Sequence, residues 1–253
     1  MNTPALPVPF ADPAPEIARL AARFRRANGP VIAVMTRLGG QIEDQLAKLP
    51  PQFRTRVEAA TLAALEHSLT ISRLGRLAPR LGPSAAPALA AVTGAAGGVG
   101  GLATSLAELP VTLTVILHTI AREAEAQGFD TASPAIRAEC LRVLCQGSPL
   151  AQDDGVNTAL IGARLTLTGP AVHKLLATVA PGLAAILTRK LAAQAVPVLG
   201  ALTGAALNAA FLRYYRDLAH VRFGLLRLAE THGPDRIIAD FARATEPPRV
   251  RRL

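Results

Sequence analysis

The stretch GAAGGVGGLATSLAELPVTL, residues 94–113, has five glycines among its first eight residues. A carboxylate follows them, and then a proline. Spacings of four and three residues place a set of small or short side chains on one stripe of a helix. That set is Gly94, Gly98, Gly101, Ser105 and Glu108. Because such a stripe has almost no side chains, a second helix backbone can approach it closely.

A second smooth stripe occurs in AQAVPVLGALTGAALNAAF, residues 193–211, where Gly200, Gly204 and Asn208 recur every four residues. Each glycine in a helix interior costs roughly 1 kcal/mol relative to alanine, so a close contact must compensate. We therefore expect the two stretches to pack as a glycine-rich helical hairpin. An irregular loop is the alternative for the first stretch.

Prolines interrupt both stretches, at Pro110 and Pro197. The residue before a proline is pushed away from the α conformation, and interrupted helices with polar groups at the break can bind ligands. The predicted ligand pocket consists of Glu108, Lys190, Gln194 and Asn208. The alternative for Glu108 is a structural one, as a helix cap or as the partner of a buried basic residue.

Known phosphate and metal motifs do not explain these residues. The glycines are not followed by the Gly-Lys-Ser/Thr of a phosphate-binding loop. Gly98, Gly100 and Ala103 match the loose dinucleotide-binding pattern, but no strand-like segment precedes them, as that pattern requires. The five histidines are scattered, without metal-ligand spacing. The sequence indicates no cofactor and no metal.

Composition predicts an all-α protein. Half of the 253 residues are apolar, mainly Ala and Leu, and there is no Trp; these residues favour helices over strands. We expect a compact multi-helix domain with a central glycine-rich hairpin and Pro-interrupted helices. The predicted divisions are a disordered Pro-rich tail at 1–13, a basic helical extension at 14–52, a helical domain at 53–245 and a basic tail at 246–253.

Apolar periodicity and Gly or Pro signals set the expected helices. The first, basic and amphipathic, carries Ile17, Leu20, Ala21 and Phe24 on one face and either docks on its own domain or lies on a membrane. From Pro110 to Gln127, Val111, Val115, Leu117 and Ile120 suggest a further helix. The other expected helices cover 30–49, 53–77, 134–146, 153–168, 170–179, 181–193, 197–231 and 235–244.

The net charge of +9 favours an anionic partner, either a membrane surface or nucleic acid. Few aromatics and no recognition motif argue against nucleic acid. Residues 81–107 and 191–212 carry no charge and are long enough to cross a bilayer. Their Ala, Gly, Thr and Pro content favours a buried hairpin over a stable membrane span.

The run KLAAQAVPVLGALTGAALNAAF, residues 190–211, resembles the signature of the EcsC family. The stretches GVGGLATSLAELPVTLTVILHTIAREAEAQG, RAECLRVLCQG and LAHVRFGLLRLAETHG resemble it too, so that the likeness covers about residues 55–244. The resemblance implies a helical protein, cytoplasmic or membrane-associated, from a family without an assigned activity, some of whose members are encoded beside an ABC transporter. The motif positions carried over are Glu108, Pro110, Gln194, Pro197, Gly200, Gly204 and Asn208.

Three functions follow as hypotheses. The first is a non-enzymatic cytoplasmic protein, peripheral to the inner membrane, that binds anionic lipid through its basic surface and a lipid tail or partner helix through the glycine-lined pair. The second is an enzyme that uses Glu108 as an acid or base, assisted by Lys190, Gln194 or Asn208. The third is an adaptor for a membrane protein such as a transporter subunit.

Overall fold

The computed structural model describes residues 12–27, 51–73, 110–146 and 200–246, together with seven positions between 180 and 188. Every regular element in these segments is a helix, and no strand occurs among them. The prediction of an all-α protein is confirmed. The expected helices at 30–49, 153–168 and 170–179 lie outside the described residues, and the proposed domain boundaries stay a prediction.

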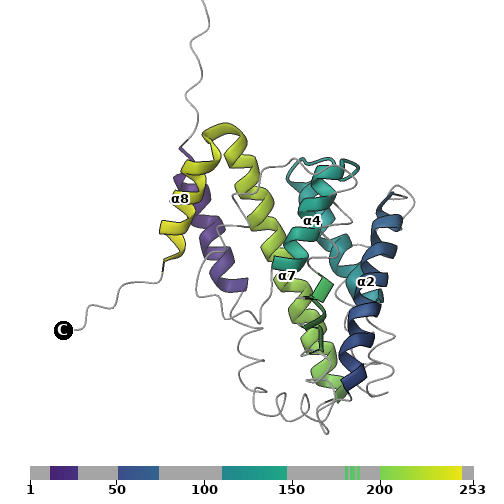
Figure 1. The fold of residues 1–253 in the computed structure, drawn as a ribbon. Coiled ribbons are helices and arrows are strands. Elements are labelled where there is room, and N and C mark those ends of the chain that lie inside the picture. The colour runs from purple at the N-terminus through teal and green to yellow at the C-terminus, as the bar shows by residue number, and fades with distance from the viewer. Residues whose placement is uncertain are drawn as a thin grey trace, which may run out of the picture.

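The long helix α7, Gly200–His232, organises the fold. Its 33 residues span about 50 Å at 1.5 Å per residue. Figure 1 shows α7 between two groups of helices: α2 and α4 on one side, and helix 14–27 with α8 on the other. Because α7 has neighbours on both sides, its sequence LAHVRFGLL, residues 218–226, is apolar almost all round the helix.

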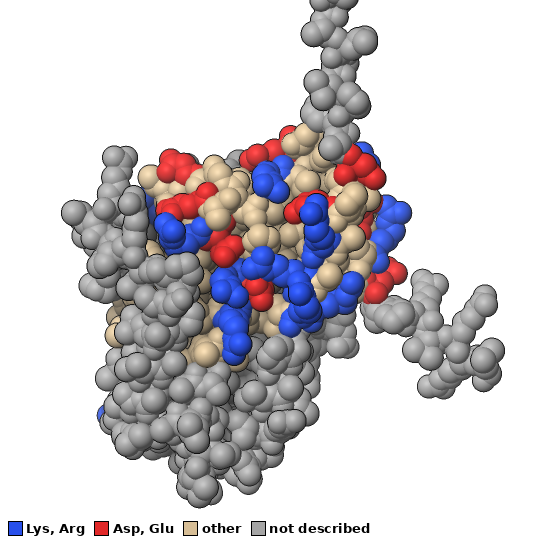
Figure 2. Space-filling view, turned by 180° about the vertical axis from the view of Figure 1, so that it is seen from behind, with Lys and Arg blue, Asp and Glu red and all other residues tan. Residues whose placement is uncertain are grey.

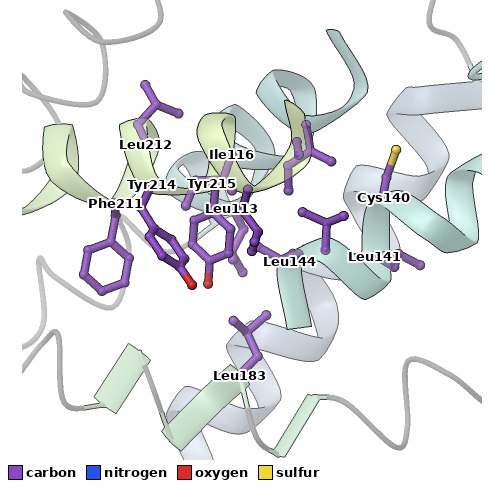
Figure 3. Close-up of a cluster of buried hydrophobic side chains, with 14 of the residues drawn as sticks. Leu113, Ile116, Cys140, Leu141, Leu144, Leu183, Phe211, Leu212, Tyr214 and Tyr215 are labelled. Atoms are coloured by element: carbon purple, nitrogen blue, oxygen red, sulfur yellow. The ribbon is translucent and has the colours of Figure 1, made fainter. Parts of the chain in front are cut away.

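The larger core lies between α7, α2 (Pro51–Arg73), helix 110–126 and α4 (Pro134–Gln146). Figure 3 shows Leu113 and Leu144 facing the rings of Tyr214 and Tyr215, with Leu183 from the segment around 184 nearby. The two tyrosine rings meet edge to face, with centroids 5.4 Å apart. Burying each such Leu side chain contributes about 1.5–3 kcal/mol, so this cluster holds the four helices together.

A tight turn connects helix 110–126 to α4. Gly128 has φ +90°, a conformation that residues other than glycine rarely adopt, and it ends the helix as a C-terminal cap. Asp130 then accepts a hydrogen bond from the Ala132 amide through its side chain, at 2.9 Å. The next helix begins at Pro134, as the Ser133-Pro134 signal predicts, because proline fits the first helical position.

A second, smaller core joins helix 14–27 to α7 and to α8, Pro234–Thr245. Gly233, at φ +84°, turns the chain from α7 into α8. The rings of Phe24 and Phe241 pack edge to face at 5.9 Å. Helix 14–27 thus docks on its own chain, one of its two expected roles. The buried members of this core are Ile17, Leu20, Ala21, Val221, Leu225, Ile237 and Phe241.

On the expected apolar face of helix 14–27, Ile17, Leu20 and Ala21 are buried, and α2 buries Val57, Thr61, Ala64 and Leu65. The helix suggested by Val111, Val115, Leu117 and Ile120 is present, but the Val111 side chain is 42% exposed. At 100° per residue Val111 lies on the far side of helix 110–126 from the stripe that packs into the core. That stripe consists of Leu113, Ile116, Ile120 and Ala124.

Candidate functional site

The expected ligand pocket falls largely outside the described residues. Asn208 is the one member that the structure describes; it lies in the first half of α7 and is buried at 2% exposure. Gly200 and Gly204 precede it on the same helix, which begins three residues after Pro197. Pro110 is the exposed first residue of helix 110–126. The remaining positions lie outside the described residues: Gly94, Gly98, Gly101, Glu108, Lys190, Gln194 and Pro197. The packing of the two smooth stripes therefore stays a prediction.

A buried ionic cluster connects α4 to α7. The Nε and Nη2 atoms of Arg222 both donate to Oε2 of Glu139, at 2.9 and 2.6 Å. Both side chains have no solvent exposure. Arg142 donates through Nη1 to the other carboxylate oxygen, Oε1. One carboxylate thus joins two guanidinium groups and ties the two helices together.

Burial shapes the electrostatics of this cluster. Burial lowers the pKa of the Arg222 guanidinium, while the adjacent Glu139 carboxylate acts in the opposite direction. Two positive charges face one negative charge, and the Nη1 atom of Arg222 has no hydrogen-bond partner among the described residues. Because Glu139 is fully buried, substrate in solution cannot reach it, and the cluster is structural.

Cys140 lies beside this cluster on α4. Burial, with a smaller contribution from the Glu139 charge, raises the pKa of its thiol from 9.0 to about 12. The thiolate is the nucleophilic form of cysteine, so Cys140 is unreactive near neutral pH. It is unpaired.

The Glu139 cluster is the feature that sequence reasoning missed, although a signal was present. Ile136 and Val143 lie three residues before and four after Glu139, on the same face of α4. Arg222 likewise lies between Val221 and Phe223 in an apolar run. A charge of each sign on a buried helix face points to a pair between the two helices.

A second polar contact joins helix 110–126 to α7. Nδ1 of His220 lies 3.0 Å from Oε2 of Glu123, and Nε2 of Gln127 lies 3.4 Å from the same ring nitrogen. His118 is half-buried, and burial followed by the charge of Arg122 lowers its pKa. Within the described residues, no group of three or more His, Cys, Asp or Glu side chains can hold a metal ion.

Arginine side chains gather on one face of the molecule, where helix 14–27 runs beside α7. Figure 2 shows basic side chains across the middle of this face. Arg23 links the two helices through a hydrogen bond and ion pair with Asp217, at 2.8 Å. Arg26 and Arg213 are exposed beside that link, and Arg216 is half-buried.

Comparisons with known proteins identify one relationship. The model of the EcsC protein family matches residues 57–228, which include most of α2, helix 110–126, α4 and most of α7. No curated protein and no solved structure matches the chain. Among the described residues, no helix combines the length and apolar character required to cross a membrane.

Proposed function

This chain belongs to the EcsC protein family, and we propose that it is a non-enzymatic helical protein that binds the anionic surface of a membrane. In this proposal it works from the cytoplasm, peripheral to the inner membrane. Its partner is anionic lipid, or a membrane protein such as a transporter subunit.

The observation that carries the proposal is the excess of basic residues, +9 for the chain, together with the group of basic side chains across the middle of the face in Figure 2. A basic residue near an anionic bilayer contributes about 1 kcal/mol of attraction, and salt weakens it. Several arginines on one face act together because they can approach the same plane. Arginine also offers a planar fork of donors that suits phosphate groups.

The second part of the proposal concerns the apolar segments. Residues 81–107 and 191–212 are uncharged and contain the two smooth stripes. Packed together with their backbones close, they would form an apolar site for a lipid tail or a partner helix. Glu108, Lys190, Gln194 and Asn208 would supply its polar contacts. The support is the spacing of the glycines, together with the burial of Asn208 on α7.

Vesicle flotation tests the lipid-surface part. The purified chain is mixed with phosphatidylcholine vesicles, with or without phosphatidylglycerol, and floated through a density gradient. We expect the chain to float with the anionic vesicles alone and to dissociate as the salt concentration rises, because salt screens charges over about 8–10 Å. Equal flotation with both kinds of vesicle, or flotation with neither, contradicts the proposal.

A further inference from the structure

We propose that an arginine seam between helix 14–27 and α7 is the surface that lies against anionic lipid headgroups. The seam consists of Arg26, Arg213, Arg216 and Arg227. The inference rests on the proposed function and goes further, because it assigns membrane contact to one face and to arginines that are almost 200 positions apart in the sequence.

The register of the two helices brings the seam together. A Cβ atom on Gly224 would lie 3.0 Å from the side chain of Leu20, and Arg23 bonds to Asp217. Residue numbers rise on one helix as they fall on the other, so the helices are antiparallel. At 1.5 Å per residue, Arg26 lies about 4.5 Å beyond Arg23, level with the turn of α7 that carries Arg213 and Arg216.

The seam arginines of the two helices lie on the same side of the helix pair. Arg26 follows Arg23 by three residues, so both lie on the edge of helix 14–27 that faces α7. On α7, Arg213 and Arg216 are three residues apart, and Arg227 follows after a further eleven, which is about three turns. All three therefore lie on one side of α7. That side is the one that its buried residues leave open.

The seam arginines differ in their partners from the exposed arginines of helix 110–126 and α8. None of the four has an ion pair with a described carboxylate, and the Nε atom of Arg216 is buried without a hydrogen-bond partner among the described residues. In contrast, Arg122 pairs with Glu125, and Arg236 and Arg243 both pair with Asp240. The seam therefore keeps charge and donors available for an external anion.

A lipid surface fits this arrangement better than a small anion does. The seam is a row along the adjoining edges of two antiparallel helices, and Arg26, Arg213 and Arg227 are exposed. A row of separate cations suits a plane of separate phosphates. The docked helix 14–27 directs its apolar face into the protein, so the contact with lipid is electrostatic.

Two variants with the same net charge test the seam. The seam variant carries Arg26→Gln, Arg213→Gln and Arg227→Gln; Arg216 is retained because part of its side chain is buried. The control variant carries Arg122→Gln, Arg236→Gln and Arg243→Gln. Each removes three positive charges. We expect the seam variant to bind phosphatidylglycerol-containing vesicles roughly a hundredfold more weakly than the parent chain, and the control to bind within about threefold.

The outcomes separate the inference from the proposed function. If both variants bind vesicles equally weakly, vesicle binding depends on the total charge of the chain. The inference about the seam is then overturned while the proposed function stands. If the parent chain does not bind anionic vesicles, both fail. A third outcome would also overturn the inference: the parent chain binds a single-stranded oligonucleotide but not vesicles, and the seam variant no longer binds the oligonucleotide. Circular dichroism and the melting temperature establish that each variant is folded.

Lysine replacements at the same three positions give an independent readout. Because attraction to a lipid surface depends mainly on charge, we expect Arg26→Lys, Arg213→Lys and Arg227→Lys together to retain vesicle binding within about fivefold. A loss as large as that of the glutamine variant would mean that the planar donors of arginine grip one specific anion, and the seam would not be a general lipid contact.

Discussion

Glu139 has no solvent exposure, yet two arginines hold it as their counter-ion. Bringing a carboxylate out of water costs several kcal/mol, and the cost is offset only when its oxygens are fully bonded. Three N–H donors from Arg222 and Arg142 meet the two oxygens. At the scale of single residues, the contact between α4 and α7 therefore depends on matched charge as well as on apolar burial.

Removing this carboxylate should destabilise the fold strongly. Glu139→Gln leaves two guanidinium groups without their counter-ion, and we expect a loss of about 3–5 kcal/mol in the free energy of unfolding, measured by urea denaturation. Arg222→Met should lower the free energy of unfolding by less, because Glu139 keeps its ion pair with Arg142 and the methionine side chain fills part of the space that Arg222 occupied. A loss below about 1 kcal/mol for Glu139→Gln would contradict this account.

Sequence reasoning succeeded for apolar residues and failed for this charged pair, for one physical reason. The burial of Ile17, Leu20 or Leu65 follows from periodicity within its own helix. The burial of Glu139 depends on Arg222, 83 positions later. Periodicity reports which face of a helix is buried, but it does not report which other helix covers that face.

At the scale of elements, Gly224 sets how closely helix 14–27 approaches α7. A Cβ there would lie 3.0 Å from Cδ2 and 3.2 Å from Cδ1 of Leu20. Leu20 is buried at 2% exposure, so it has little room to move. The glycine weakens α7 slightly as a helix, and the close contact with Leu20 compensates for that weakness.

A larger side chain at this position should release helix 14–27. Gly224→Val overfills the contact, and we expect a loss of about 1–3 kcal/mol together with faster tryptic cleavage after Arg19 and Arg23. Adding Leu20→Ala should restore part of the protection. Gly128→Ala serves as the control: its φ of +90° makes it destabilising, but nothing lies within 4 Å, so tryptic cleavage in helix 14–27 should not change. Unchanged tryptic cleavage in the Gly224→Val protein would contradict the role of Gly224 in the close contact between α7 and helix 14–27.

Element boundaries were largely predictable because Gly and Pro mark them. The signals at Gly128, Ser133-Pro134 and Gly233-Pro234 each coincide with a helix end. Val111 shows the limit of this approach: an apolar residue near a helix start can indicate the helix and still lie on its exposed side. The candidate pocket was predicted from the two proline breaks and the polar side chains near them, and it stays a prediction: Asn208 is buried on α7, and its other members lie outside the described residues.

At the scale of the whole molecule, the seam predicts how the protein lies on a bilayer. The chain has no tryptophan, so the fluorescence of a single introduced tryptophan can be measured without emission from other tryptophans. Ala22→Trp places the indole between Arg19 and Arg26 on helix 14–27, and Ala59→Trp places it on the exposed face of α2. Figure 1 shows these two helices on opposite sides of α7.

We expect anionic vesicles to shift the emission of the Ala22→Trp protein to shorter wavelength and to leave that of the Ala59→Trp protein unchanged. The reason is that the indole at position 22 enters the less polar interface, where tryptophan prefers to lie. A shift at position 59 with none at position 22 would mean that another face meets the lipid.

The smaller core also has a consequence for how the chain is made. Arg25 donates to the carbonyl of Ala244, 219 positions later, at 2.5 Å. Helix 14–27 therefore leaves the ribosome long before α8, and its apolar face stays uncovered while the intervening chain is synthesised. Contacts between such distant segments form slowly. A chaperone that shields this helix during translation would raise the yield of native protein more than one that acts on α4.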